Sequence, residues 1–230
     1  MRFFLDTADV SAWETWLPTG LFYGVTSNPL LLERAGQACT IPHLQTLMAL
    51  ALKYGTQEVQ VQTWGPTVET LVENGLALST TAQNVLGPHT TARVVIKVPI
   101  TKMGIQAATQ LLKKGIPITL TAVYLPQQVA IAAALQVDYA APYLGRICDQ
   151  GADGHQLLTT MHHILQRTHS STRLLVASIR SISDIVTLAA EGLDTFTISP
   201  AIATALFQVD ATLTATADFE RAAAVMSGDG

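Results

Sequence analysis

Short apolar runs alternate with amphipathic stretches along the whole sequence. Eight of these runs are predicted to be strands, at residues 2–5, 22–25, 58–62, 94–98, 117–121, 139–141, 174–177 and 195–198. Helical patterns separate them, at residues 9–16, 43–54, 68–79, 102–114, 127–135, 154–167 and 182–191. Apolar strands that alternate with helices are typical of a parallel sheet that is buried on both faces. Eight units in 230 residues therefore predict an α/β fold, a (β/α)8 TIM barrel.

The chain shows no Gly/Ser-rich linker and no break in composition. We therefore expect a single domain over residues 1–230, with an extra C-terminal helix near 212–225. Charged residues make up only 13% of the chain and hydrophobic residues 49%. A surface so poor in charge suggests that much of it is covered, most simply by association between copies of the chain.

Charge and hydropathy exclude two classes of partner. The net charge of −4 offers no basic surface for nucleic acid, and no apolar run is long enough to span a membrane. The N-terminus turns polar at Asp6, too early for a signal peptide. Cys39 and Cys148 show neither metal spacing nor a disulfide framework, so we expect a cytoplasmic protein.

Polar side chains stand where the predicted strands end. They are Asp6, Thr26 with Asn28, Gln62, Lys97, Thr121, Tyr143, and Ser178 with Arg180. The eighth strand ends at Ser199 and Pro200 and adds little. In a barrel of this kind the carboxyl ends of the strands and the loops that follow them form the site of chemistry. These side chains are therefore predicted to surround one pocket.

Lys97 is the central residue of this set. It lies in Val-Val-Ile-Lys-Val-Pro-Ile-Thr, residues 94–101, where apolar residues precede and follow it. Burial disfavours the ammonium form, and a neutral amine is a nucleophile suited to Schiff-base chemistry. The alternative is that Lys97 lies at the strand end and extends its ammonium into solvent.

Other residues of the set also allow two interpretations. Asp6 could cap a helix, or it could balance the charge of an iminium on Lys97 and transfer a proton. Asn28 could belong to an Asn-Pro turn or hold a substrate hydroxyl. Thr121 and Tyr143 could be satisfied by the backbone, or they could hold a water molecule. Gln62 ends an apolar strand, where an unbonded amide is costly.

Arg146, Arg180 and Ser178 suggest a phosphate site. Two guanidinium groups and a hydroxyl suit a phosphate dianion, and the late loops of many barrels bind phosphate. The alternative is that the two arginines form ordinary surface ion pairs.

Six motifs follow one another along the chain. They are Phe-Leu-Asp-Thr-Ala-Asp (4–9), Gly-Val-Thr-Ser-Asn-Pro (24–29), Val-Ile-Lys-Val-Pro-Ile-Thr (95–101), Thr-Ala-Val-Tyr (121–124), Ala-Pro-Tyr-Leu-Gly-Arg-Ile (141–147) and Ala-Ser-Ile-Arg (177–180). In this order they resemble the transaldolase family, and more closely its small fructose-6-phosphate aldolase branch. The resemblance covers nearly the whole chain.

The resemblance implies a role for each residue. Lys97 forms the Schiff base with the ketone donor, while Asp6 and Asn28, next to Thr26, bind donor hydroxyls and assist cleavage of the carbon–carbon bond. Thr121, Tyr143 and Gln62 surround a catalytic water, and Arg146, Ser178 and Arg180 hold the phosphate of the aldehyde. The substrates it implies are sugar phosphates and ketones such as dihydroxyacetone. It also implies no metal and no organic cofactor, and a homo-oligomer (a pentamer or decamer) in which the C-terminal helix packs on a neighbour.

Two positions separate the branches of this family. Transaldolases usually carry Glu where this chain has Gln62, and Phe where it has Tyr143, so both positions follow the aldolase pattern. The predicted activity is therefore cleavage of fructose 6-phosphate, with transaldolase as the alternative and a non-catalytic sugar-phosphate-binding barrel as a third hypothesis. The segment between Gln62 and Lys97 is longer than the family pattern, and it contains Trp64 and a predicted turn at residues 87–89.

Overall fold

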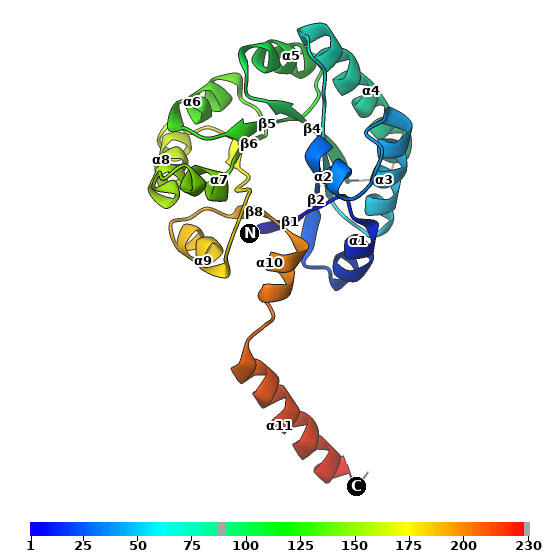
Figure 1. Cartoon of the computed structure of the whole chain (residues 1–230), viewed down its shortest axis with the longest axis vertical. Helices are drawn as coiled ribbons and strands as arrows, with labels where there is room; N and C mark the ends of the chain where they lie inside the picture. Colours follow the sequence, from blue (N-terminus) through cyan, green and yellow to red (C-terminus); the bar gives the residue numbers. More distant parts are fainter. Residues whose placement is uncertain (87–90, 228–230) are drawn as a thin grey trace.

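The computed structural model describes residues 1–86 and 91–227, and the predicted turn at 87–89 lies outside these residues. Eight parallel strands form one sheet in the order β7-β6-β5-β4-β3-β2-β1-β8. The strands are β1 (Arg2–Asp6), β2 (Phe22–Thr26), β3 (Glu58–Gln62), β4 (Arg93–Pro99), β5 (Ile118–Val123), β6 (Tyr139–Pro142), β7 (Arg173–Leu174) and β8 (Thr195–Ile198). The predicted (β/α)8 barrel is confirmed, and Figure 1 views it along its axis.

The barrel closes between the seventh and eighth strands through single hydrogen bonds. Regular pairing of β7 covers only two residues, whereas the prediction placed this strand at 174–177. The next residues continue the ladder in an irregular way. The Val176 N–H donates to the Thr195 carbonyl at 2.9 Å, and the Thr197 N–H donates to the Val176 carbonyl at 2.8 Å. The eighth strand is therefore joined to both of its neighbours.

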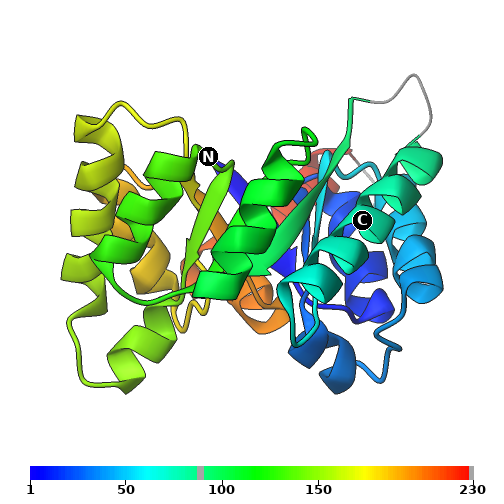
Figure 2. The ribbon, with the colours of Figure 1, turned by 90° about the horizontal axis from the view of Figure 1, so that it is seen from above.

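Helices surround the sheet, as Figures 1 and 2 show. They are α1 (Val10–Trp16), α2 (Pro29–Arg34), α3 (Ile41–Lys53), α4 (Val68–Leu86), α5 (Lys102–Leu112), α6 (Pro126–Leu135), α7 (Leu144–Asp149), α8 (Gly154–Arg167), α9 (Ile182–Ala190), α10 (Pro200–Ala205) and α11 (Asp210–Ser227), with a 3-10 turn η1 (Leu17–Thr19). Because the helices cover one side of the sheet and the barrel interior lies on the other, strand residues are buried on both faces. In β4 the five residues between Arg93 and Pro99 are all buried.

The sequence prediction missed three short helices, α2, α7 and α10, each of six residues. They follow β2, β6 and β8 directly, and they are too short to produce a helical pattern of apolar residues. Pro29 and Pro200 stand at the first position of two of them, where proline favours a helix start. The prediction also ended the fourth helix at residue 79, but α4 continues to Leu86 and takes up much of the longer segment before Lys97.

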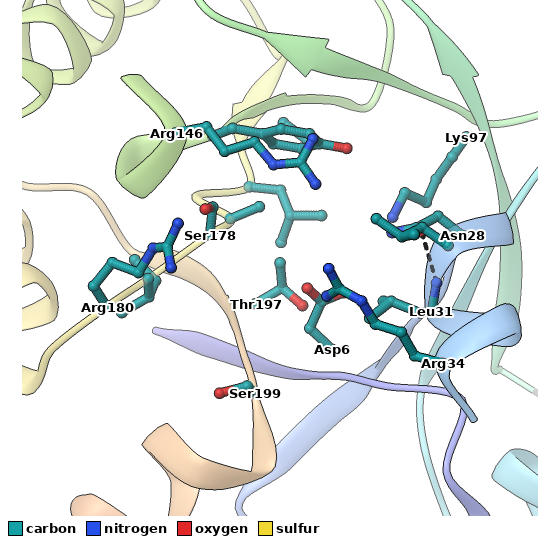
Figure 3. A pocket seen from close by; sticks show the side chains of 16 residues that line it. Asp6, Asn28, Leu31, Arg34, Lys97, Arg146, Ser178, Arg180, Thr197 and Ser199 are labelled. Carbon is teal, nitrogen blue, oxygen red and sulfur yellow. Dashed lines mark hydrogen bonds between the residues drawn. The ribbon is translucent and has the colours of Figure 1, made fainter. Parts of the chain in front are cut away.

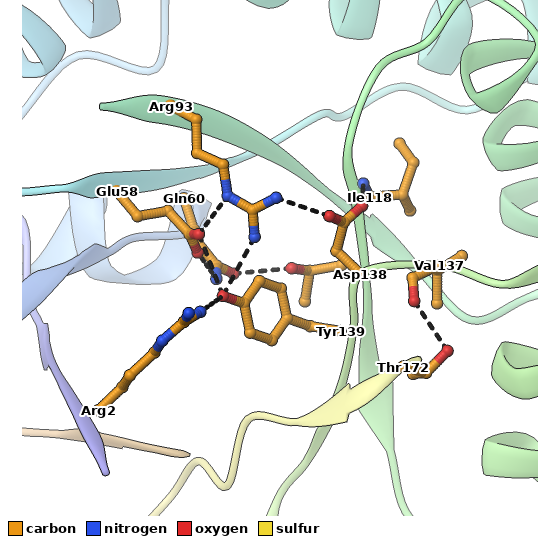
Figure 4. Close-up of polar contacts among 10 residues, drawn as sticks. Arg2, Glu58, Gln60, Arg93, Ile118, Val137, Asp138, Tyr139 and Thr172 are labelled. Atoms are coloured by element: carbon orange, nitrogen blue, oxygen red, sulfur yellow. Dashed lines mark hydrogen bonds and ion pairs between the residues drawn. The ribbon is translucent and has the colours of Figure 1, made fainter. Parts of the chain in front are cut away.

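A polar network fills the barrel at the amino ends of the strands (Figure 4). Glu58 is fully buried, and its carboxylate accepts hydrogen bonds from Arg93 Nε at 2.7 Å, Tyr139 Oη at 3.1 Å and Gln60 Nε2 at 2.7 Å. Arg93 also pairs with Asp138 at 2.8 Å. A buried carboxylate is tolerated only when it is paired and hydrogen-bonded. This end of the barrel is therefore built for stability, and the opposite end is open for ligands.

The C-terminal helix α11 extends away from the barrel in Figure 1. None of its residues is buried, and Leu213, Phe219 and Val225 are 59%, 70% and 74% exposed. The segment before it contacts the barrel, where the ring of Phe207 stacks on that of Trp16 with 5.9 Å between the ring centres. The apolar side chains of α11 therefore have no partner within the described part of this chain. No helix of residues 1–86 and 91–227 is apolar enough over sufficient length to cross a membrane.

Candidate active site

A cavity of about 280 Å³ opens at the carboxyl ends of the strands (Figure 3). Seven predicted site residues line it: Asp6, Asn28, Lys97, Tyr143, Arg146, Ser178 and Arg180. Gln62 and Thr121 line an adjoining hollow that shares Asn28, Tyr143 and Arg146 with the first. Thr26 lies behind the cavity wall, bonded to Asp6. The fold thus brings together side chains from the ends of β1 to β7.

Lys97 lies inside the barrel wall on β4 and is only 4% exposed. Burial lowers the pKa of its ammonium group, and the negative charge of Asp6 partly opposes this effect. The alternative that the side chain extends into solvent does not hold, because the lysine is buried and its amine faces the cavity. A buried amine with a lowered pKa provides more of the neutral, nucleophilic form near neutral pH.

Asp6 does not cap a helix. The cap of α1 is Asp9, whose side chain accepts from the Ser11 N–H at 2.9 Å. The Asp6 carboxylate instead accepts a hydrogen bond from the Thr26 hydroxyl at 2.6 Å, and Thr197 Oγ1 lies 2.6 Å from the same hydroxyl. Since the single proton of Thr26 goes to Asp6, the Thr197 hydroxyl must be the donor to Thr26. These two hydrogen bonds hold one oxygen of the Asp6 carboxylate and leave its other oxygen available to a ligand.

Asn28 begins α2 as its N-cap, and its side-chain oxygen accepts from the Leu31 N–H at 3.0 Å. Figure 3 shows this bond and places Asn28 beside the Lys97 amine. The two interpretations of Asn28 are therefore compatible. The carbonyl oxygen of the amide serves the helix, and its NH2 group stays available as a donor at the cavity.

Thr121 and Tyr143 meet through their hydroxyls, which lie 2.9 Å apart. Burial raises the pKa of Tyr143, and the bond with Thr121 opposes this rise. A bulge in β5 shifts the register between Thr121 and Val123, and Ala122 between them has a φ of 60°. Such a left-handed residue costs energy and is frequent at functional sites. On the other side of Lys97, Gln62 is its register partner in β3.

The two arginines of the predicted phosphate site differ in their partners. Arg146 lies over the ring of Tyr143, with its guanidinium carbon 4.9 Å from the ring centre. Arg180 forms an ion pair with Asp149 at 2.7 Å, and both side chains are more than half exposed. Arg180 therefore forms the surface ion pair of the alternative interpretation, and it also lines the cavity. Among the described residues Arg146 makes no such pair.

The loop after β7 is held close to α7. Ser178 has a φ of 60°, and its carbonyl accepts from the Gly145 N–H at 2.9 Å. A Cβ on Gly145 would collide with the Ser178 carbonyl and with the Arg180 side chain. Only glycine at this position lets the loop and the helix approach so closely.

Comparison with known proteins identifies the family. A sequence model of transaldolase/fructose-6-phosphate aldolase matches residues 3–228. The chain belongs to this family. A protein of Phenylobacterium zucineum strain HLK1 that is named probable transaldolase is 32% identical over 210 residues, which cover 90% of this chain and 89% of that protein. Another from Caulobacter sp. strain K31 with the same name is 31% identical over 209 residues, again 90% and 89% of the two chains.

A solved structure supports the fold alone. A flavocytochrome b2 variant with bound sulfite superposes with a TM-score of 0.56 at 11% identity, and the match covers 86% of this chain and 56% of that one. Membership of the transaldolase/fructose-6-phosphate aldolase family indicates an enzyme of the aldolase or transferase kind.

Three polar residues that line the cavity were not among the predicted site residues: Arg34, Thr197 and Ser199, the last of which was set aside as the end of the eighth strand. Thr197 lies two residues before Ser199. Because side chains in a strand alternate with a period of two, the two residues share a face, and this period could have indicated Thr197 as a residue of the cavity. Arg34 gave no signal, because the helix that carries it was not predicted. Trp64 lines neither the cavity nor the adjoining hollow, and it packs against the core instead.

Proposed function

We propose that this member of the transaldolase/fructose-6-phosphate aldolase family is a class I aldolase. It cleaves fructose 6-phosphate reversibly to dihydroxyacetone and glyceraldehyde 3-phosphate. The observation that carries the proposal is the buried amine of Lys97, which has a lowered pKa and shares a cavity with the carboxylate of Asp6. Such an amine can form a Schiff base with a ketone without a metal or an organic cofactor.

In the first half of the reaction, the neutral Lys97 amine adds to the ketone carbon, and the resulting carbinolamine takes up a proton and loses water to leave an iminium. Asp6 then accepts the proton of the hydroxyl on the fourth carbon, the bond between the third and fourth carbons breaks, and its electrons pass to the iminium. The products are an enamine on Lys97 and the free aldehyde. Asn28, whose NH2 group faces the cavity, binds a donor hydroxyl during these steps.

In the second half, the enamine takes up a proton at carbon and water hydrolyses the resulting iminium, which releases dihydroxyacetone and restores the amine. We assign this water to the hollow lined by Gln62, Thr121 and Tyr143. A glutamine amide orients water but accepts no proton at neutral pH. The proton therefore moves through the Tyr143 hydroxyl, which is bonded to Thr121.

The second candidate is a transaldolase, which passes the three-carbon enamine from fructose 6-phosphate or sedoheptulose 7-phosphate to another aldose phosphate, as in the pentose phosphate pathway. The names of the relatives favour it, and Gln62 with Tyr143 favours the aldolase. Both reactions should be assayed side by side. Release of dihydroxyacetone without an acceptor sugar supports the aldolase, and strict dependence on erythrose 4-phosphate supports the transferase.

Borohydride reduction separates both enzymes from a non-catalytic sugar-phosphate-binding barrel. Reduction in the presence of fructose 6-phosphate should fix a covalent adduct on Lys97, to be located by peptide mass spectrometry. Lys102, the first residue of α5 and three residues beyond the end of β4, is the internal control and should stay unmodified. The Schiff-base mechanism would be excluded by the absence of any adduct on Lys97.

We also propose that α11 packs on a neighbouring copy of the chain in a cytoplasmic homo-oligomer, a pentamer or decamer by resemblance. Its unpartnered apolar residues support this. Replacing Leu213 and Phe219 with Asp should reduce the sedimentation coefficient, and unchanged sedimentation would contradict the proposal. Cell fractionation tests the location.

A further inference from the structure

The cavity contains a third arginine, Arg34, the last residue of α2. Asn28 and Pro29 fix the start of this short helix at the mouth of the barrel. Leu30 and Arg34 are four residues apart, so they share a helix face, and both line the cavity. In Figure 3 the guanidinium of Arg34 reaches toward the middle of the cavity from the side of Asp6, and Arg180 lies on the opposite side.

The charges around the cavity are strongly unequal. Three arginines, Arg34, Arg146 and Arg180, face a single carboxylate, Asp6, although the whole chain has a net charge of −4. A concentration of one sign of charge in a cleft attracts ligands of the opposite sign. The cavity is therefore suited to an anion that carries more than one negative charge.

The ion pairs decide which cations are available to that anion. Arg180 is already engaged by the carboxylate of Asp149 at 2.7 Å. Among residues 1–86 and 91–227, neither Arg34 nor Arg146 forms an ion pair with a carboxylate. A phosphate dianion is best balanced by two guanidinium groups. Arg34 and Arg146 are the two arginines of the cavity without a carboxylate partner among these residues, although Arg146 also bonds to Tyr124 and lies over the Tyr143 ring.

We propose that Arg34 is a specificity-determining residue that binds the phosphate of the substrate together with Arg146. The inference rests on the proposed function, since it assumes that the ligand is a phosphorylated aldehyde or sugar. Through Arg34, the helix α2 takes part in phosphate binding. Arg180 contributes less, because it already forms an ion pair with Asp149.

The test compares two aldehydes in the synthetic direction, with dihydroxyacetone as the donor. For Arg34→Gln, kcat/KM with glyceraldehyde 3-phosphate should fall by about tenfold or more, as expected for loss of a charge-assisted hydrogen bond. With unphosphorylated glyceraldehyde it should change far less. Arg34→Lys should recover part of the loss. Arg167→Gln is the matched control, because Arg167 is also an exposed arginine in the last turn of a helix.

The same variants should be titrated with inorganic phosphate, whose binding does not depend on turnover. Arg34→Gln should weaken phosphate binding, and Arg167→Gln should not. An unchanged phosphate affinity and an unchanged ratio between the two aldehydes would overturn the inference, and so would an equal loss with both aldehydes. If the proposed function is wrong, the wild-type protein shows no turnover and no borohydride adduct. In that case the phosphate titration alone decides whether Arg34 binds phosphate.

Discussion

The hydroxyl of Tyr143 lies 2.9 Å from that of Thr121, beside the hollow that Gln62 lines. Tyr143 is the N-cap residue of α7 and Thr121 lies in β5, so two neighbouring barrel units build the pair. Because burial raises the pKa of Tyr143, its hydroxyl stays protonated at neutral pH and can donate as well as accept. A hydroxyl pair of this kind can pass a proton to or from a water molecule.

Replacement of Tyr143 tests this role. Tyr143→Phe should lower kcat for cleavage of fructose 6-phosphate by about 100-fold, because the proton donor and acceptor is lost while the ring remains. Thr121→Val should lower it less, since Tyr143 keeps its own hydroxyl. Tyr54→Phe, on the far side of the barrel, is the control. Full activity of Tyr143→Phe would remove the residue from the mechanism.

The lowered pKa of Lys97 predicts how adduct formation depends on pH. The rate of borohydride trapping should rise with pH and reach half of its maximum below the ordinary lysine pKa of about 10.4, because the neutral amine is the nucleophile. A midpoint at or above the ordinary value would contradict the burial argument. The rate should be measured under saturating ketone over a range of buffers.

Lys97 should also affect stability in a defined direction. Its pKa is lower in the folded chain than in the unfolded chain, so the unfolded state binds more protons between these two values. Stability should therefore rise with pH across that window. Lys97→Met should abolish trapping, raise the free energy of unfolding at neutral pH, and remove this rise, as urea titrations at several pH values would show. A misfolded Lys97→Met protein would instead show that the lysine is structural.

Thr26 links Asp6 to Thr197 through hydrogen bonds of 2.6 Å each. Thr26→Val keeps the shape but leaves both partners unpaired, so we expect a loss of about 1–3 kcal/mol in the free energy of unfolding. Activity should also fall, because Asp6 is no longer held in place. Thr26→Ser restores the hydroxyl and should recover most of both. If Thr26→Val retained full activity, the chain of hydroxyls would have no part in positioning Asp6.

The polar network at the other end of the barrel predicts sensitivity to alkali. Burial raises the pKa of Tyr139 to about 12, while an unfolded tyrosine titrates at about 10. The folded state thus binds more protons in this window, and stability should be lost as pH rises from about 10 to about 12. Tyr139→Phe should show a smaller loss over the same range. Thermal unfolding measures this loss of stability. If the wild-type protein and Tyr139→Phe lost equal stability between these pH values, groups other than Tyr139 would be responsible.

The order of elements and the strand ends were predictable from the sequence because they depend on local patterns. Runs such as 94–98 can be buried only in a sheet covered on both faces, and parallel connections bring the strand ends to one mouth. Asp6, Lys97 and Tyr143 could therefore be placed near one another before the fold was known. The short helices α2, α7 and α10 could not, since six residues are too few to show a helical period.

The sequence by itself determined the barrel and the set of polar residues at its mouth, because both follow from hydrophobic periodicity and chain order. Only the tertiary structure decided how these residues pair. Asp9 rather than Asp6 caps α1, Asp149 pairs with Arg180, and α2 carries Arg34 to the cavity. The physical reason is that hydrogen bonds and ion pairs act over a few ångströms, between groups that the fold brings together and that lie far apart in the chain.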